Sequence, residues 1–429
     1  MVERRRVTGA AAAEPPRVVT ADRQQIELRP FDLESLLAPE HRARAIWAMV
    51  EGLDLTKFYE TIVARGSEPG RPAIDPKVLV ALWLYATSEG VGSARELARL
   101  CEAHDAYRWL CGGVGVNYHT LSDFRVGHEA ALDALLTQVL AAMLHRGLVK
   151  LERVAHDGMR VRASAGAASF RREPSLRACL AAAEAQVAHV KQEAEHPLPG
   201  RSARAQAAAA RAARERAKRV QQALTELPAV QAIKPTAEQK TQARVSTTDA
   251  EARVMKMGDG GFRPAYNVQL ATTTDGRAIV GVQVTNRGSD AGQLEPMVEE
   301  IAQRTGTRPT EYLVDGGFVK LESITAAAAQ GVTVYAPVPE PRTPGIDRYA
   351  PKTDDTPAVA AWRQRMGTEA AKAIYKERAA TAETTNADCR THRGLDRFNV
   401  RGHTKVLCVA LWTAVTYNAL RSIAAGGVT

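Results

Sequence analysis

The spacing of apolar side chains changes along the chain and divides helical from strand-forming regions. Between residues 30 and 146 the apolar positions recur at helical spacing. An apolar helix is predicted to begin at Pro76, with Asp75 as its cap. Ser93-Ala-Arg-Glu96 has the pattern of a capping box for a second helix.

A third short helix is predicted from Thr120, with Leu121 and Phe124 as its apolar anchors. Arg125 and His128 are predicted to face outward from it. Short helices joined by glycine-rich turns fit a helix-turn-helix-like DNA-binding unit. They fit a plain helical bundle equally well.

The period falls to two within residues 148–163, which indicates a β-strand. Apolar residues alternate here with arginines: Met159, Arg160, Val161, Arg162 and Ala163. The predicted strand therefore has one apolar and one basic face. Asp157 lies in it, next to Gly158, which permits a turn.

Residues 171–228 interrupt the strand pattern with an alanine-rich, helix-forming stretch. Its second half holds one acid, Glu215, among seven basic residues: Arg201, Arg204, Arg211, Arg214, Arg216, Lys218 and Arg219. We expect a helical hairpin inserted into a sheet domain. Its basic side chains form either a solvated face or a surface that lies along a phosphate backbone.

Strands are predicted to resume after a loop at about residues 230–262. Tyr266, Val268 and Leu270 alternate with polar residues, Asp275-Gly276 marks a hairpin, and valines alternate again in residues 280–284. Further elements follow in order: a helix at 293–303, a strand at 312–314, a helix at 322–330, a strand at 332–337, a proline-rich loop at 337–357, a helix at 358–380 and a buried helix at 405–417.

The strand at 312–314 ends in the sequence Asp315-Gly-Gly. A carboxylate is thereby placed at a sheet edge, where two glycines let the backbone turn away and leave room for a ligand. A second strand-borne carboxylate, Asp157, lies upstream, and Glu383 lies on a basic helix downstream. Three such carboxylates brought together by the fold are able to hold two divalent metal ions for phosphodiester chemistry.

Composition indicates the class of binding partner and the cellular compartment. The 429-residue chain has a net charge of +9 and a pI of about 9.4, which favours a polyanionic partner such as nucleic acid. Only 5% of its residues are aromatic, which argues against binding of single strands by base stacking. Its five cysteines form no C-x-x-C pair, so we expect a reducing cytoplasm. The longest apolar run, residues 406–412, is short for a membrane span.

The motifs around these acids resemble those of DDE transposases of bacterial insertion sequences. His156-Asp-Gly-Met-Arg-Val-Arg-Ala163 resembles the first-aspartate strand, Tyr266-Asn-Val-Gln269 a second-strand element, and Leu313-Val-Asp-Gly-Gly-Phe318 the second-aspartate motif. The third motif is a Tyr, two residues, an Arg, three or four residues, a Glu, six residues and a Lys. It is matched by Tyr375, Arg378, Glu383 and Arg390, the last in place of Lys. Arg393-Gly394, Arg401-Gly402 and Asn418 continue the C-terminal pattern.

The resemblance implies an α+β protein: an RNase H-like mixed sheet flanked by helices, with an all-helical N-terminal domain and a helical insertion after the first strand. It implies that Asp157, Asp315 and Glu383 bind two Mg²⁺ ions, with Mn²⁺ as a substitute, and catalyse strand cleavage and transfer at element ends. The DNA-binding residues it implies are Tyr375, Arg378, Arg390, Arg393 and Arg401. The implied partners are double-stranded DNA, as terminal inverted repeats and target, and a second copy of the chain as a homodimer on DNA, without a membrane. The implied setting is a bacterial cytoplasm, at the nucleoid when bound to DNA.

The expected domain boundaries follow from the pattern of apolar residues together with the family resemblance. Residues 1–28 form a basic, disordered leader, 29–147 a helical DNA-binding domain, 148–423 the catalytic domain interrupted at 171–228, and 424–429 a flexible tail. Two other functions stay open: a DNA-binding derivative without catalysis, and a nuclease on the same fold.

Helical spacing gives independent support to Glu383 as the third acid. Glu383 and Arg390 lie seven residues apart, close to two turns, and so are predicted to project from one face. Glu377 and Glu369 are rival carboxylates, expected to be solvated surface acids. Asp290 is expected to be a cap or turn residue. His156 is expected to point away from Asp157.

Overall fold

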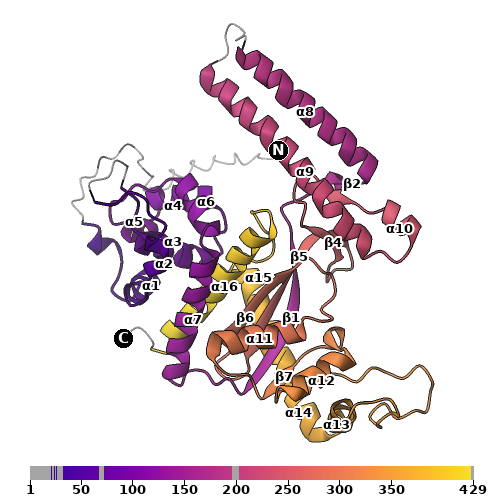
Figure 1. The fold of residues 1–429 in the computed structure, drawn as a ribbon. Helices are drawn as coiled ribbons and strands as arrows, with labels where there is room; N and C mark the ends of the chain where they lie inside the picture. The colour runs from indigo at the N-terminus through magenta and orange to yellow at the C-terminus, as the bar shows by residue number, and fades with distance from the viewer. Residues whose placement is uncertain are drawn as a thin grey trace, which may run out of the picture.

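The computed structural model describes residues 21, 24, 26, 32–66, 72–195 and 202–426. Figure 1 shows a bundle of N-terminal helices, a central sheet with helices around it, and a long two-helix arm that projects from the body. The predicted leader at 1–28 falls almost entirely outside the described residues, as do the last three residues of the predicted tail.

Within the described residues, seven α-helices precede the first strand: α1 Arg42–Glu51, α2 Thr56–Tyr59, α3 Pro76–Ser88, α4 Ala94–Ala103, α5 Asp105–Cys111, α6 Tyr118–Val126 and α7 Glu129–His145. The predicted caps are confirmed. The Asp75 carboxylate accepts a hydrogen bond from the N–H of Lys77, and the Ser93 hydroxyl accepts one from the N–H of Glu96. Nearly every residue of α3 is buried, because α1, α5 and the C-terminal helix α16 (His403–Ala424) surround it.

The prediction that Arg125 faces outward is wrong. Its side chain is buried, its guanidinium lies 4.6 Å from the ring centroid of Trp83, and it donates a hydrogen bond to the carbonyl of Gly92. Burial lowers the pKa of Arg125 to about 10. His128, also expected outside, packs its ring against Phe58 and Phe124.

The central sheet is mixed. It contains β1 Arg153–Arg162, β4 Arg253–Lys256, β5 Phe262–Thr273, β6 Ile279–Thr285, β7 Glu311–Leu313 and β8 Thr333–Tyr335. β1 lies between β5, which is antiparallel to it, and β7, which is parallel to it; β8 continues beyond β7. The other edge of β5 pairs first with β4 and then with β6. This mixed α+β architecture is consistent with an RNase H-like fold.

Helices of the C-terminal half cover the sheet: α11 Leu294–Thr305, α12 Leu321–Ala329, α13 Pro357–Met366, α14 Glu369–Arg378, α15 Thr384–His392 and α16 His403–Ala424. The helix predicted at 358–380 is divided after Met366, because Gly367 ends α13 and the Thr368 hydroxyl caps α14. A π-helical turn, Ala379–Glu383, joins α14 to α15. The segment Thr384-Thr385-Asn386 therefore does not break the helix but begins α15.

The arm consists of α8 Glu173–Glu195 and α9 Ala203–Ala232 (Figure 1). α9 continues through Pro228, four residues beyond the predicted end of the insertion, because Leu227 and Val230 are buried against Leu176 and Val245. The predicted loop at 230–262 in fact contains the short helix α10 Ala237–Thr241, β4 and the strand β3 Val245–Ser246, which pairs with β2 Phe170–Arg171. Packing at the base of the arm thus overrides the local signal of the proline.

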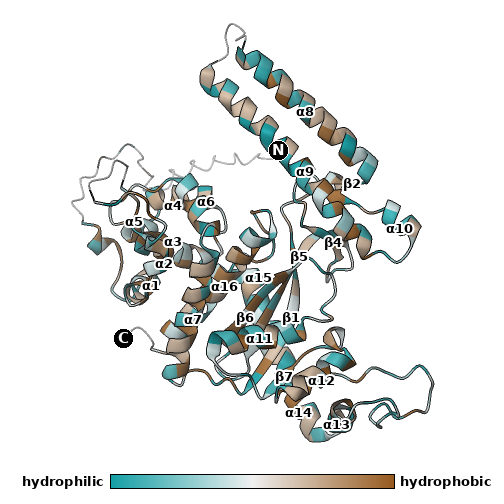
Figure 2. Cartoon of the chain, in the orientation of Figure 1, coloured by the Kyte–Doolittle hydropathy of each residue, from teal (hydrophilic) through white to brown (hydrophobic). Residues whose placement is uncertain are grey.

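α16 joins the N-terminal helices to the sheet. It packs against α7, α3 and β6, and one continuous hydrophobic core runs from the N-terminal bundle into the sheet. Figure 2 shows the apolar strands enclosed between α16 and α11. Among the described helices only α16 is long and apolar enough to span a membrane, yet 78% of its apolar window is buried inside the protein. It is therefore the core helix that the sequence predicted at 405–417.

Asn418 on α16 forms hydrogen bonds with both backbone polar groups of Ile279, where β6 begins at the edge of the sheet. Its amide accepts a hydrogen bond from the N–H of Ile279 and donates one to the carbonyl of Ile279, both at 2.8 Å. We expect Asn418→Ala to lower the free energy of unfolding by about 2–4 kcal/mol, because both backbone groups lose their buried partner. Urea unfolding measures this. Asn399→Ala removes a longer, exposed contact of 3.4 Å to Gly92 and serves as the control, with an expected change below about 0.5 kcal/mol. Equal effects of the two substitutions would contradict the assignment.

Candidate active site

The register between β1 and β7 brings two distant aspartates level with each other. Arg153 pairs with Glu311 and Ala155 with Leu313, so each residue of β1 faces the one 158 positions later. Asp157 and Asp315 differ by the same 158 positions. Neighbouring strands lie ~4.8 Å apart, so continuing this register by two residues would place Asp157 and Asp315 at neighbouring positions just beyond the end of β7.

The π-helical turn brings the third carboxylate to the same place. Arg378 and Glu383 are five residues apart, which in an α-helix would turn them about 140° away from each other. A π-turn closes its hydrogen bonds from i to i+5 and restores a shared face. The Arg378 guanidinium thus lies 3.4 Å from Glu383 Oε1 and 3.7 Å from Asp157 Oδ1.

Asp157 is largely buried and accepts two hydrogen bonds. Its Oδ2 accepts a hydrogen bond from Asn386 Nδ2 at 3.0 Å, and its Oδ1 accepts one from the N–H of Gly158 at 3.0 Å. Burial raises the pKa of Asp157 to about 6; Arg378 opposes this shift and the charge of Asp315 adds to it. The effect of Asp315 agrees with the proximity that the strand register gives.

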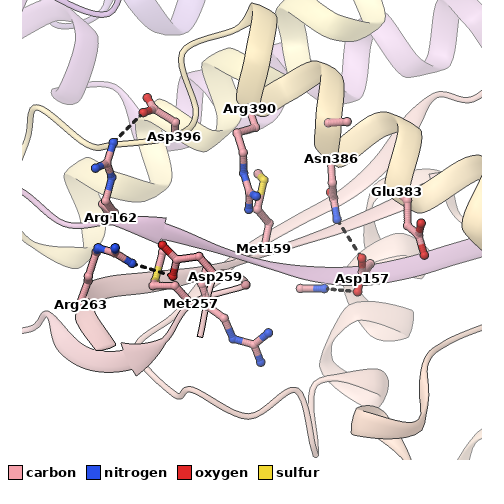
Figure 3. Close-up of a pocket in the computed structure, with 14 residues that line it drawn as sticks. Asp157, Met159, Arg162, Met257, Asp259, Arg263, Glu383, Asn386, Arg390 and Asp396 are labelled. Carbon is pink, nitrogen blue, oxygen red and sulfur yellow. Dashed lines mark hydrogen bonds and ion pairs between the residues drawn. The ribbon is translucent and has the colours of Figure 1, made fainter. Parts of the chain in front are cut away.

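A cavity of about 610 Å³ opens over β1 beside these acids. Asp157, Glu383 and Arg390 line it, whereas Asp315 does not. Figure 3 shows Glu383, Asn386 and Arg390 projecting from one side of the helix toward β1, as the seven-residue spacing predicts. Three further arginines line the cavity, each paired with an acid: Arg160 with Asp290, Arg162 with Asp396 and Arg263 with Asp259.

The other predicted DNA-binding residues lie at different distances from this cavity. Tyr375 is half-buried close to Arg378, and burial raises its pKa. Arg393 faces the N-terminal bundle instead, where it donates to the carbonyl of Ser88 at 2.6 Å and pairs with Asp388. Arg401 donates to the carbonyl of Ser164 and lines a separate groove beside α9.

The rival carboxylates are engaged elsewhere. Glu369 is exposed and pairs with Lys372 on its own helix. Glu377, expected to be solvated, instead pairs with Arg153 at 2.6 Å and so ties α14 to β1. His156 is fully buried on the opposite face of β1 against Tyr312 and Phe318, and burial lowers its pKa to about 3. It does point away from Asp157, as alternation along a strand requires.

Asp290 is more than the cap or turn residue expected. It is buried, and its carboxylate accepts hydrogen bonds from Asn267 and Gln269, both at 2.7 Å, and from Arg160 at 3.0 Å. A Cβ on Gly158 would lie 2.1 Å from Asp290 Oδ1. Gly158 thus marks not a turn but the point on β1 where this polar cluster comes closest to the strand.

The donor chemistry of the site fits divalent cations. Asp157, Asp315 and Glu383 offer hard carboxylate oxygens, the ligands that Mg²⁺ prefers. No His, Cys, Asp or Glu side chains within the described ranges form a ready group of three at metal-binding spacing. Between Asp157 and Glu383 the positive charge is that of Arg378, whose Nη1 is buried without a hydrogen-bond partner. In this structure, one guanidinium thus pairs with both Asp157 and Glu383.

Comparison with known families gives two partial matches. Residues 31–127 match a family described as Transposase domain (DUF772), and residues 349–423 match one described as Transposase DDE domain. Both matches support a DDE transposase of the insertion-sequence type. No curated protein and no solved structure matches the chain significantly.

The two matches lie at the ends of the chain and leave the region between them uncovered. The second match includes Glu383, Asn386 and Arg390, whereas Asp157 and Asp315 lie outside both. Sequence reasoning also passed over Asn386 and Asp290 as contacts of the strand that holds Asp157. Asn386 lies three residues after Glu383, close to one helical turn, and that spacing was the available signal. Asp290 had no such signal, because its partners are more than 20 residues away.

Gly158→Ala is expected to lower the free energy of unfolding of the protein by about 1–3 kcal/mol, because the added methyl group overpacks the Asp290 cluster. Chemical denaturation of the purified variant measures this. Gly166→Ala is the matched control, since no atom lies within 4 Å of its added Cβ. Similar losses in both variants would show that the space around Gly158 is not restrictive.

The raised pKa of Asp157 predicts a pH-dependent stability. Because the folded-state pKa of Asp157, about 6, exceeds the ordinary aspartate pKa of 3.8, the folded state favours protonated Asp157. Its stabilising contribution is complete below about pH 4 and is lost as pH rises through 6. The free energy of unfolding of the wild type minus that of Asp157→Asn should thus fall by up to about 3 kcal/mol between pH 4 and 8, in urea titrations with EDTA present. A constant or rising difference would contradict the burial of this carboxylate.

Proposed function

We propose that this chain cleaves DNA at the ends of an insertion sequence and joins the freed 3′ ends to target DNA, with Mg²⁺ as cofactor. The alignment of Asp157 with Asp315 across β1 and β7, with Glu383 brought close by the π-turn, is the observation that supports it most. Two family matches to transposase domains support the same chemistry.

Asp157, Asp315 and Glu383 would hold the divalent ions. When bound, such ions supply an activated hydroxyl and stabilise the charge on the leaving oxygen. Asn386 keeps the Asp157 carboxylate oriented through its hydrogen bond. Arg378 pairs with Asp157 and Glu383, and its charge would also attract a phosphate of the DNA, together with Tyr375 beside it.

The substrate in this proposal is double-stranded DNA, which follows from the transposase-domain matches and the net charge of +9. Arg390 is exposed at the cavity and has no ion-pair or hydrogen-bond partner among the described residues. It is thus available for phosphate oxygens. The N-terminal helices bind the element ends, and two copies act together on DNA in the cytoplasm.

Asp157→Asn, Asp315→Asn and Glu383→Gln should each reduce Mg²⁺-dependent cleavage by at least ~10²-fold, as for loss of a preorganised electrostatic group. The substrate is a duplex bearing the DNA that flanks the coding region, and products are resolved on denaturing gels. Glu369→Gln, an exposed acid of the neighbouring helix, is the control and should cleave normally. Wild-type cleavage by any of the three variants would remove that residue from the site.

A second function is favoured by one observation. Arg378 occupies the space between Asp157 and Glu383, which also suits a DNA-binding derivative that does not cut. Binding of the same duplex by the wild type without Mg²⁺-dependent nicking would favour this alternative. A nuclease on the same fold would cut without joining, which a strand-transfer assay separates from transposition.

A further inference from the structure

The outer face of α9 presents a row of unpaired cations. Arg204, Arg211 and Lys218 follow one another at seven-residue spacing, and Arg214 lies beside them. All four are exposed, and none has an ion-pair or hydrogen-bond partner in the part of the chain that the structure describes. We name these four residues the α9 stripe. It spans ~21 Å from Arg204 to Lys218.

The other charges of the arm are paired or mixed in sign. Arg216 lies on the side toward α8 and donates to Gln186, and Glu215, which lies between Arg214 and Lys218 in the sequence, pairs with Arg219. On α8, Arg177 pairs with Glu173, and the exposed Lys191 lies near the acids Glu193 and Glu195. Unpaired positive charge is thus more concentrated on α9 than on α8, whereas a merely solubilising surface mixes both signs.

The stripe continues into a groove at the base of the arm. Lys218 lines this groove of about 660 Å³ opposite Arg401 and Lys405, at the start of α16. Its acids already have partners: Glu226 pairs with Arg253, Asp249 accepts from Tyr266, and Glu251 accepts from the N–H of His403. Lys218 and Lys405 have none among the described residues, so their charge is available to a ligand.

From these features we propose that the α9 stripe and this groove bind the phosphate backbone of duplex DNA outside the catalytic cavity. Each DNA strand offers one phosphate per 3.4 Å of axis, so ~21 Å of stripe faces about six phosphates. No Phe, Tyr or Trp occurs in α8 or α9, which excludes the base stacking that single strands need. Two such stripes would repel each other, which disfavours a second copy of the chain as the occupant.

Position along the chain connects this surface to the cavity. Asp396 lines the cavity and Arg401 the groove, and a short loop runs between them. The DNA segment bound by the arm would therefore lie next to the segment bound in the cavity at Asp157 and Glu383. This inference rests on the proposed function in taking DNA as the ligand.

The test replaces three stripe residues in the full chain: Arg204→Gln, Arg211→Gln and Lys218→Gln. The control variant carries Lys150→Gln, Lys240→Gln and Lys352→Gln, which removes the same charge from exposed lysines outside α8 and α9. Binding of a labelled random-sequence duplex is measured by anisotropy across a salt series. We expect the stripe variant to bind on the order of tenfold more weakly or worse, and its slope of log K against log salt to fall by about 2.7. The control should retain the wild-type slope.

Circular dichroism verifies that the stripe variant stays helical, and sedimentation measures its self-association. Equal slopes for the two variants overturn the proposal, as does a loss of self-association with duplex binding unchanged. The proposed function fails separately: a wild type that never cleaves, but whose duplex binding still depends on the stripe, refutes catalysis and leaves this inference in place.

Discussion

The parallel pairing of β1 with β7 is the constraint on which the site depends. Three residue pairs fix an offset of 158 positions, and the same offset separates Asp157 from Asp315. A slip of one residue would turn one carboxylate to the opposite face of the sheet. The ion pair of Arg153 with Glu311 spans the same two strands, and Glu377 extends it to α14. Strand register and these ion pairs thus fix the position of α14 relative to β1 and β7.

Much of the fold was predictable because its signals are local. The alternation in β1, β5 and β6, the Asp75 and Ser93 caps and the apolar run of α16 each depend on residues within one element. The elements missed depend on distant partners. α9 continues past Pro228 because its end packs on Leu176 and Val245, and Arg125 is buried because Trp83 and Gly92 surround it.

The candidate site likewise contains residues that the sequence predicts and residues whose positions depend on distant partners. The two aspartates and Glu383 were identified by motif, and the helical spacing of Arg390 agrees with its place in the cavity. Arg393 was not distinguishable from Arg390 by sequence, since both follow Glu383 on a basic segment. Only the folded structure shows that Arg393, just after α15, turns toward Ser88 at the end of α3 and away from the acids. Likewise, the buried place of Asp290 follows from Asn267 and Gln269 on the neighbouring strand.

The π-helical turn at Ala379–Glu383 has a consequence for how this protein tolerates change in length. The π-turn accommodates one extra residue within a single wider helical turn, so that α15 keeps its orientation over the sheet. Related chains with one residue fewer at this point would regain ordinary helical geometry without relocating their acid. Variation in the number of residues between an arginine and a glutamate is thus compatible with a fixed catalytic geometry, and a rigid spacing rule would overlook such relatives.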